Sequence, residues 1–155
     1  MEYKNKRYVL DANVFLEYIF GRKYQNIAKK LISQAITGEN EIIIPSLALD
    51  EISEVLCGNM NDLDKITTHL RYLEKLVYEE ILKIVIPTAK IRIHAMKMAR
   101  QGHKKSGYPE FTDCLYHAVA LFNDALFITN DRKHFAKVKD FGHIQLLPDV
   151  ISDND

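Results

Sequence analysis

The sequence predicts an α/β fold, a three-layer α/β/α sandwich with a mainly parallel central sheet. Short apolar runs alternate with longer segments in which apolar residues recur at helical spacing. Strands that alternate with helices need right-handed crossovers, which give a parallel sheet covered on both faces. The 155 residues, 47% of them hydrophobic, can bury one core but leave little for a second, so we expect a single domain over 1–155.

Four apolar runs are too short to be helices and predict buried strands, with a fifth, weaker run near the end. They span 8–10, 42–44, 84–86 and 126–128, and the weaker run spans 145–147. In open parallel sheets, ligands gather beyond the carboxyl ends of the strands, where the strand order reverses. Functional residues should therefore follow directly after strands.

Five segments between these runs carry one apolar face at helical spacing and predict helices. They span 27–36, 46–57, 63–77, 91–99 and, after an N-cap at Thr112, 113–122. A glycine stands at or just beyond the end of the first, second and fourth segments, where it can stop a helix. No repeat or Pro/Gly-rich linker interrupts this order.

The charge balance limits the classes of partner. The chain has 21 basic and 21 acidic residues, so contact with nucleic acid must come from local patches. No apolar run approaches the length that spans a bilayer, and the first residues lead into a strand without a signal-peptide core. We therefore expect a cytoplasmic protein with no membrane contact.

The cysteines and histidines do not predict a zinc or redox site. Cys57 and Cys114 lack paired spacing and fall in predicted helices, where we expect buried free thiols. The six histidines form no metal-ligand pattern and are expected on the surface or in helix packing. His117 lies one turn after Asp113 on the same helix face, so an approach to a site at Asp113 stays open.

Four acidic residues occupy the positions where this fold places function. Asp11 follows the first strand, and Asp131 follows the fourth after two residues. Asp113 opens the helix before that fourth strand, and Glu51 lies on the helix after the second strand. All four side chains can converge on one rim of the sheet.

Converged carboxylates predict a bound cation, because they raise one another's pKa unless positive charge is present. Ligation by oxygen alone favours Mg²⁺ or Mn²⁺ over zinc. Each acid also has an ordinary structural reading. Asp113 and Asp131 can cap helices, the latter a short helix over 132–136, and Glu51 shares its helix with solvated Asp50 and Glu54. Their common position relative to the sheet favours the metal site.

The segments around these acids resemble, in order, the four motifs of PIN domains. The first is Val-Leu-Asp-Ala-Asn-Val-Phe-Leu, a strand ending in Asp11 and followed by a helix that starts near Asn13. The others are Ile-Pro-Ser-Leu-Ala-Leu-Asp-Glu-Ile at 44–52, Phe-Thr-Asp-Cys-Leu-Tyr-His-Ala-Val-Ala-Leu at 111–121 and Phe-Ile-Thr-Asn-Asp-Arg-Lys-His-Phe at 127–135. The resemblance extends over roughly 8–147.

The resemblance implies a metal-dependent ribonuclease. It implies that Asp11 and Asp113 are the core ligands of one or two Mg²⁺ or Mn²⁺ ions, with Glu51 and Asp131 completing the site directly or through water. Asn13 and Thr129 would orient ligands or waters. In-line attack of water on a phosphodiester would leave 5′-phosphate and 3′-hydroxyl ends.

Within the family, the short chain most resembles the toxins of VapC-type toxin–antitoxin pairs. Such toxins commonly form homodimers and are held inactive by a small antitoxin protein. Stand-alone PIN nucleases that process RNA, and non-catalytic PIN modules that bind RNA or protein, remain alternatives. The four intact acids argue against a non-catalytic module.

Basic residues that could contact single-stranded RNA flank two of the acids. Segment 81–109 contains no acidic residue and leads into Asp113. The candidates for RNA contact are Arg100, Lys104, Lys105 and Tyr108 in this segment, and Arg132 and Lys133 after Asp131. Ordinary solvated surface is the alternative for both groups.

Two other acidic α/β classes fit less well. Phosphatases of the haloacid dehalogenase type, which the segment after the first strand also resembles, need a second aspartate where Asn13 stands. Phospho-receiver domains need an aspartate after a central strand, whereas Pro87 and Thr88 follow the run 84–86. A metal-dependent ribonuclease remains the favoured hypothesis.

Overall fold

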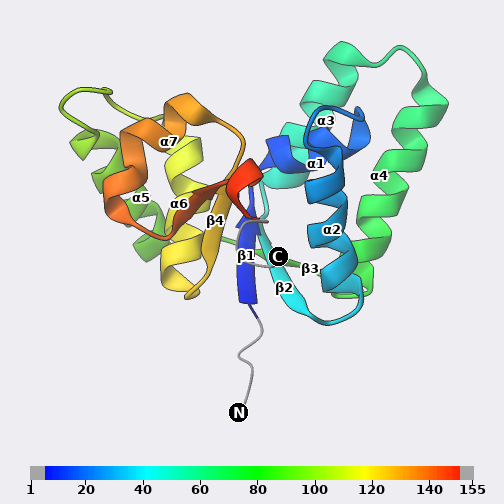
Figure 1. The fold of residues 1–155 in the computed structure, drawn as a ribbon, viewed down its shortest axis with the longest axis horizontal. Coiled ribbons are helices and arrows are strands. Elements are labelled where there is room, and N and C mark those ends of the chain that lie inside the picture. Colours follow the sequence, from blue (N-terminus) through cyan, green and yellow to red (C-terminus); the bar gives the residue numbers. More distant parts are fainter. Residues whose placement is uncertain (1–5, 151–155) are drawn as a thin grey trace.

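A computed structural model describes residues 6–150, which form one sheet with helices on both sides (Figure 1). The strands are β1 (Lys6–Leu10), β2 (Asn40–Pro45), β3 (Leu82–Val85), β4 (Leu126–Thr129) and β5 (Ile144–Leu146). The helices are α1 (Ala12–Ile19), α2 (Gln25–Ile36), α3 (Ala48–Asn59), α4 (Leu63–Tyr78), α5 (Ala89–Gln101), α6 (Phe111–Phe122) and α7 (Arg132–Val138). Two 3-10 turns, η1 (Lys139–Phe141) and η2 (Leu147–Asp149), flank β5.

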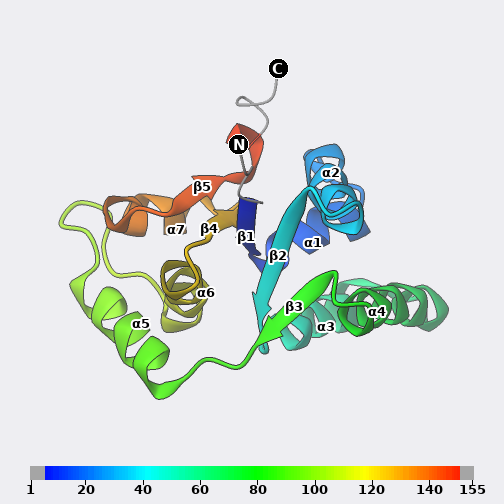
Figure 2. The same ribbon diagram turned by 90° about the horizontal axis from the view of Figure 1, so that it is seen from below.

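The sheet has the order β3-β2-β1-β4-β5, and every neighbouring pair is parallel. The chain runs outward from β1 to β3 and then returns across the sheet to β4. Helices α1 to α4, which connect β1, β2 and β3, cover one face of the sheet, and α5 to α7 cover the other face (Figures 1 and 2). The predicted three-layer α/β fold is confirmed. The strand order reverses between β1 and β4, where such sheets bind ligands.

Helix α6 has more buried residues than any other helix within residues 6–150. Every residue from Cys114 to Ala120 is buried, because α6 packs between the sheet and α5. A helix that is apolar on all sides belongs in a core of this kind. The largest fully buried side chains are Tyr116, Phe15 and Phe127. The ring centroids of Tyr116 on α6 and Phe127 on β4 lie 5.8 Å apart. This packing fixes the helix that carries Asp113.

Several predicted boundaries shift. Strand β3 covers 82–85 and stands at the sheet edge, so Ile86 lies beyond it and is 75% exposed. Helix α3 begins at Ala48, because Ser46 pairs with the edge strand through its backbone N–H and Val85. The weaker fifth strand forms as β5, one residue earlier than expected.

The start of α6 corrects a predicted cap. Glu110 is the N-cap, with extended backbone, and its carbonyl accepts from the Cys114 N–H at 3.1 Å. Thr112 is therefore inside the helix, and Asp113 is its third residue rather than its first. Asp113 still lies in the first turn, where backbone N–H groups favour negative charge.

The two cysteines differ in environment. Cys114 is buried as predicted, whereas Cys57 is exposed, which corrects the expectation of two buried thiols. Cys57 lies one residue after Leu56, the last buried residue of α3, so it projects away from the core. No helix within residues 6–150 is long and apolar enough to cross a membrane.

Candidate active site

Asp11 lies at the carboxyl end of β1, beside the end of β4. Its backbone N–H donates to the Ile128 carbonyl at 3.0 Å and so extends the β1–β4 pairing one residue beyond the strand. This register brings Asp11 next to Thr129, whose hydroxyl donates to Asp11 Oδ2 at 2.8 Å. Asp11 is only 5% exposed. Parallel pairing thus joins two residues that are far apart in the sequence.

Asn13 also holds the Asp11 side chain. Its Nδ2 donates to Asp11 Oδ2 at 3.3 Å and lies 3.4 Å from Thr129 Oγ1. Its Oδ1 accepts from the backbone N–H of Asn130 at 3.1 Å. Asn13 therefore links the start of α1 to the end of β4, and both predicted orienting residues contact Asp11.

Glu17 holds Asn130, the residue whose backbone N–H donates to Asn13, and it was not predicted from the sequence as a site residue. It is 6% exposed on α1, and its Oε1 accepts from Asn130 Nδ2 at 2.9 Å. Its Oε2 accepts from the Tyr24 backbone N–H at 2.9 Å. The available signal was an acid in the otherwise apolar run Val14–Ile19, which suggests a buried and paired carboxylate.

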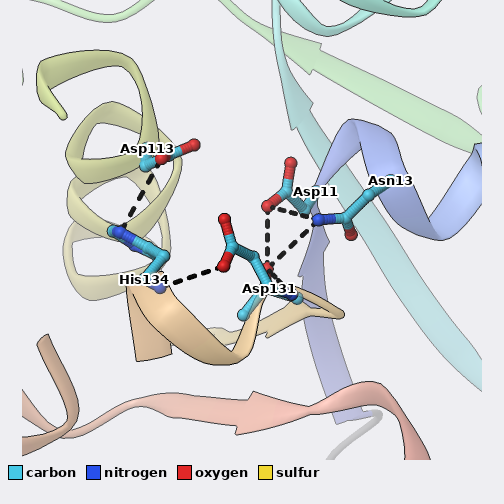
Figure 3. Close-up of polar contacts among 6 residues, drawn as sticks. Asp11, Asn13, Asp113, Asp131 and His134 are labelled. Carbon is cyan, nitrogen blue, oxygen red and sulfur yellow. Dashed lines mark hydrogen bonds and ion pairs between the residues drawn. The ribbon is translucent and has the colours of Figure 1, made fainter. Parts of the chain in front are cut away.

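Asp131 begins α7 and points into the same region. Its Oδ1 accepts from the His134 backbone N–H at 3.0 Å, and its own N–H donates to Thr129 Oγ1 at 3.1 Å. The helix cap considered for Asp131 therefore exists. Figure 3 shows that the carboxylates of Asp131, Asp11 and Asp113 nevertheless face one common space. Capping uses one oxygen and leaves the other available.

Asp113 approaches from α6 on the other side of that space (Figure 3). The side chain is 23% exposed, and His134 Nδ1 lies 3.8 Å from Asp113 Oδ2. Burial lowers the pKa of His134 to about 4, so the imidazole is neutral at pH 7. The proximity of His134 and Asp113 could not be predicted from the sequence, because the two residues belong to different helices.

Glu51 completes the set from the first turn of α3. Its Oε1 is buried and has no hydrogen-bond partner among residues 6–150. The hydroxyl of Tyr116 is also buried, and its polar interaction with Glu51 lowers the pKa of that carboxyl, although the two groups do not reach ordinary hydrogen-bond geometry in this range. A buried carboxylate oxygen needs polar partners, so Glu51 Oε1 is suited to bind a cation or an ordered water.

The pKa values show that the acids are close enough to repel one another. Burial, with a contribution from the charge of Asp131, raises the pKa of Asp11 to about 6. Burial raises the pKa of Asp113 to about 7, and the charges of Asp11, Glu110, Asp131 and Glu51 add to the rise. The pKa of Glu51 is raised by burial and then by Asp11. Each of the four predicted acids therefore lies within electrostatic range of at least two of the others.

The donor set fits a hard divalent cation. The four acids offer only oxygen ligands, and Glu51 Oε1 forms no hydrogen bond within residues 6–150. Among residues 6–150, no three His, Cys, Asp or Glu side chains are already close enough to hold an ion between them. Mg²⁺ does not require such a cage, since it keeps several waters and binds proteins through one or two carboxylates.

His117 does not reach the acids. It is fully buried, its Nε2 donates to the Gly142 carbonyl at 2.6 Å, and its ring stacks on Phe127. Burial lowers the pKa of His117. The approach to Asp113 left open by the sequence does not occur, because Nε2 is directed at the Gly142 carbonyl and the ring packs between Phe127 and Phe141.

The residues predicted to contact RNA are all exposed. Helix α5 ends at Gln101, and a basic loop, defined here as residues 102–108, leads through Pro109 to α6. The exposed side chains are Arg100, Lys104, Lys105 and Tyr108 on this side, and Arg132 and Lys133 on α7. Tyr108 is 70% exposed, which leaves its ring free to stack on a base.

Comparisons with known proteins identify the fold. The structure of VapBC-1 from nontypeable Haemophilus influenzae is 21% identical with a TM-score of 0.64, covering 92% of this chain and 98% of that chain. VapBC2 from Rickettsia felis, bound to a DNA fragment from its promoter, is 20% identical with a TM-score of 0.64, covering 90% and 96%. VapC20 from Mycobacterium tuberculosis, described as a sarcin–ricin loop cleaving toxin, is 14% identical with a TM-score of 0.57, covering 76% and 84%.

At these identities the solved structures establish a shared fold and no more. No curated protein matches the chain. The profile of the PIN domain, in contrast, matches residues 8–140, which include all four acids and the residues that orient Asp11. The chain therefore belongs to the PIN domain family.

Proposed function

We propose that the protein is a Mg²⁺- or Mn²⁺-dependent endoribonuclease that hydrolyses RNA phosphodiester bonds. The observation that carries this proposal is the meeting of Asp11, Glu51, Asp113 and Asp131 where the strand order reverses, with raised pKa values at three of them. Perturbed acids gathered in one place are typical of a functional site. Nucleases of this family supply the chemical precedent.

Each acid has a role in the proposed site. Asp11 and Asp113 would be the principal ligands, and Glu51 and Asp131 would bind directly or through water. One or two bound ions would supply the positive charge that activates water and stabilises the leaving oxygen. Thr129 donates a hydrogen bond to Asp11 Oδ2 and so fixes the orientation of the carboxylate that would bind the cation.

The basic loop is a suitable guide for the RNA backbone. His103 and Gly107 exchange two backbone hydrogen bonds of 2.9 Å, and His103 Nδ1 accepts from the N–H groups of Lys105 and Ser106 at 3.1 and 3.2 Å. His103 Nε2 lies 3.5 Å from Asp140 Oδ2 in η1. These contacts order the loop and leave the neighbouring lysine side chains exposed to phosphate.

The proposed biological role is that of a toxin in a toxin–antitoxin pair. The similar VapBC structures from Haemophilus influenzae and Rickettsia felis support this role. A small antitoxin would then inhibit the chain, and the active form would be a homodimer. Purification from its native cells in a stable complex with a small protein supports the toxin role. An uninhibited, free chain would favour a stand-alone RNA-processing nuclease.

Cleavage of single-stranded RNA in Mg²⁺ or Mn²⁺ tests the proposed reaction. The native chain should cut, whereas Asp11→Asn and Asp113→Asn should lose at least about 100-fold in rate, since even residues that only orient ligands contribute about 10 to 100-fold. Asp124→Asn is the matched control, because Asp124 is exposed just before β4, at the opposite end of that strand.

Three results would contradict the proposal. Equal cutting by the native chain and both site variants would point to another active centre or a contaminating nuclease. Cutting that survives removal of divalent ions by EDTA would exclude metal dependence. Release of phosphate from small phosphate esters, without cleavage of RNA, would favour a phosphatase.

A further inference from the structure

His134 is a buried histidine whose ring forms no hydrogen bond within the described part of the chain. The residue is 3% exposed, and neither Nδ1 nor Nε2 has a hydrogen-bond partner among residues 6–150. Buried polar atoms are paired in the great majority of cases, and each exception requires an explanation. A phenylalanine would fill this position without leaving two polar atoms unpaired, so packing alone does not account for histidine.

The contacts of His134 indicate a role for its ring in the candidate active site. One edge packs against Phe127, with ring centroids 6.1 Å apart and planes at 82°. Nδ1 lies 3.8 Å from Asp113 Oδ2, while the backbone N–H donates to Asp131 Oδ1 at 3.0 Å. His134 therefore stands between two acids of the site that come from different helices (Figure 3).

Asp113 lacks the support that the other aspartates have. The Asp11 carboxylate accepts hydrogen bonds from Thr129 and Asn13, and Asp131 accepts one from a backbone N–H. No hydrogen bond within residues 6–150 reaches the Asp113 carboxylate, and the His134 ring is the polar group paired with it. Metal ligands are usually held by such a partner, whose loss typically lowers affinity or activity by about 10 to 100-fold.

We propose that His134 is a positioning residue that donates its Nδ1–H to Asp113 Oδ2 and so aims that carboxylate at the bound cation. This inference rests on the proposed metal-dependent function. The 3.8 Å separation exceeds a hydrogen bond, but such bonds are often long in ligand-free sites and shorten when the site is filled. The required tautomer carries its proton on Nδ1, because a carboxylate oxygen only accepts.

Two substitutions separate positioning from packing. His134→Phe keeps the ring against Phe127 but removes the donor, whereas His134→Asn keeps a donor near the Nδ1 position and loses ring volume. His94→Phe is the matched control, because His94 packs on Phe122 in a similar edge-to-face manner, with centroids 5.4 Å apart and planes at 76°. His94 has no ion pair with an acid in residues 6–150.

The readouts are Mn²⁺ affinity by electron paramagnetic resonance, kcat and KM for RNA, and the thermal midpoint in EDTA. We expect His134→Phe to weaken Mn²⁺ binding by about 10 to 100-fold and to lower kcat with little change in KM. His134→Asn should recover most of the affinity. The EDTA midpoint of His134→Phe should match or exceed that of the native chain, because two unpaired polar atoms are removed.

Native Mn²⁺ affinity in His134→Phe would overturn the inference, as would equal losses in His94→Phe. The His134 tautomer, measured by ¹⁵N nuclear magnetic resonance without and with Mg²⁺, is an independent test. A proton on Nδ1 supports the hydrogen bond, and a proton that stays on Nε2 in both states excludes it. A native chain that neither binds Mn²⁺ nor cuts RNA would overturn the proposed function, and the tautomer would still decide whether His134 donates to Asp113.

Discussion

The carboxyl group of Asp113 is partly buried and lies near several other acidic side chains. Its pKa is raised from 3.8 to about 7, first by burial and then by its acidic neighbours. The folded chain therefore binds this proton more tightly than the unfolded chain. Ionising Asp113 removes folding free energy progressively between about pH 4 and about pH 7, and the loss is complete above that range.

Asp113→Asn should therefore stabilise the metal-free protein in a pH-dependent way. Without the repelled charge, the free energy of unfolding in EDTA should rise by about 1 to 3 kcal/mol at pH 8, a range reduced for solvent screening of the partly exposed side chain. The gain should be much smaller at pH 4.5. Chemical denaturation at both pH values measures the difference.

The same variant should lose stabilisation by metal. Mn²⁺ raises the thermal midpoint of a chain that binds it in the folded state, so the native midpoint should rise with Mn²⁺ and the Asp113→Asn midpoint should rise far less. Asp124→Asn, with an exposed carboxylate, should behave like the native chain in both measurements. A gain from Asp113→Asn that is equal at pH 4.5 and pH 8 would contradict the electrostatic explanation.

At the scale of elements, the basic loop depends on a glycine at its first position. Gly102 has φ 55° and ψ −150°, a backbone region that is nearly restricted to glycine. A Cβ added there would lie 2.7 Å from the Gly107 carbonyl oxygen, which accepts the His103 N–H. The close approach of the two glycines is what closes the loop.

Gly102→Ala should therefore destabilise the chain and disorder the loop. Backbone strain of this kind costs about 1 to 3 kcal/mol, and the contact with Gly107 adds to it. Gly142→Ala is the control, since Gly142 has a similar backbone, φ 73° and ψ −176°, with open space around an added Cβ. Unfolding free energies should fall further for Gly102→Ala, and only that variant should weaken RNA binding. Equal losses in stability would show that the Gly107 contact is unimportant.

At the scale of the whole molecule, net charge is the property that bears on RNA. The formal net charge is zero, with 21 basic and 21 acidic residues, so no long-range field draws RNA to the chain. Affinity must come from a few local contacts with phosphate. Binding should accordingly weaken with salt by a modest exponent that reflects those contacts.

The joint substitution Lys104→Ala and Lys105→Ala should reduce that salt dependence. Each phosphate contact contributes about 0.7 to the slope of log K against log salt for single strands, so losing two contacts should reduce the slope by about 1.4. Binding by Asp113→Asn, which cannot cut efficiently, measures this without cleavage. Lys29→Ala and Lys30→Ala, on exposed positions of α2 across the sheet, form the control pair. An unchanged slope would show that the two lysines of the basic loop do not contact RNA phosphates.

The sequence determined the layer architecture and the order of the elements, because hydrophobic periodicity depends on residues only a few positions apart. It also placed Asp11 and Asp131 just after strands and Glu51 on the helix that follows one, so their convergence could be expected from parallel pairing. The edge position of β3 and the exposure of Cys57 were not predictable in this way, since each depends on which neighbours a segment acquires.

Only the tertiary structure decided which groups hold those acids in place. Glu17 reaches Asn130 from another element, and His134 reaches Asp113 across two helices. Such contacts depend on strand register, on the handedness of the crossovers and on the orientation of whole helices, which local spacing does not encode. Periodicity fixes the direction in which a side chain leaves its own element, whereas packing between distant elements fixes what it meets.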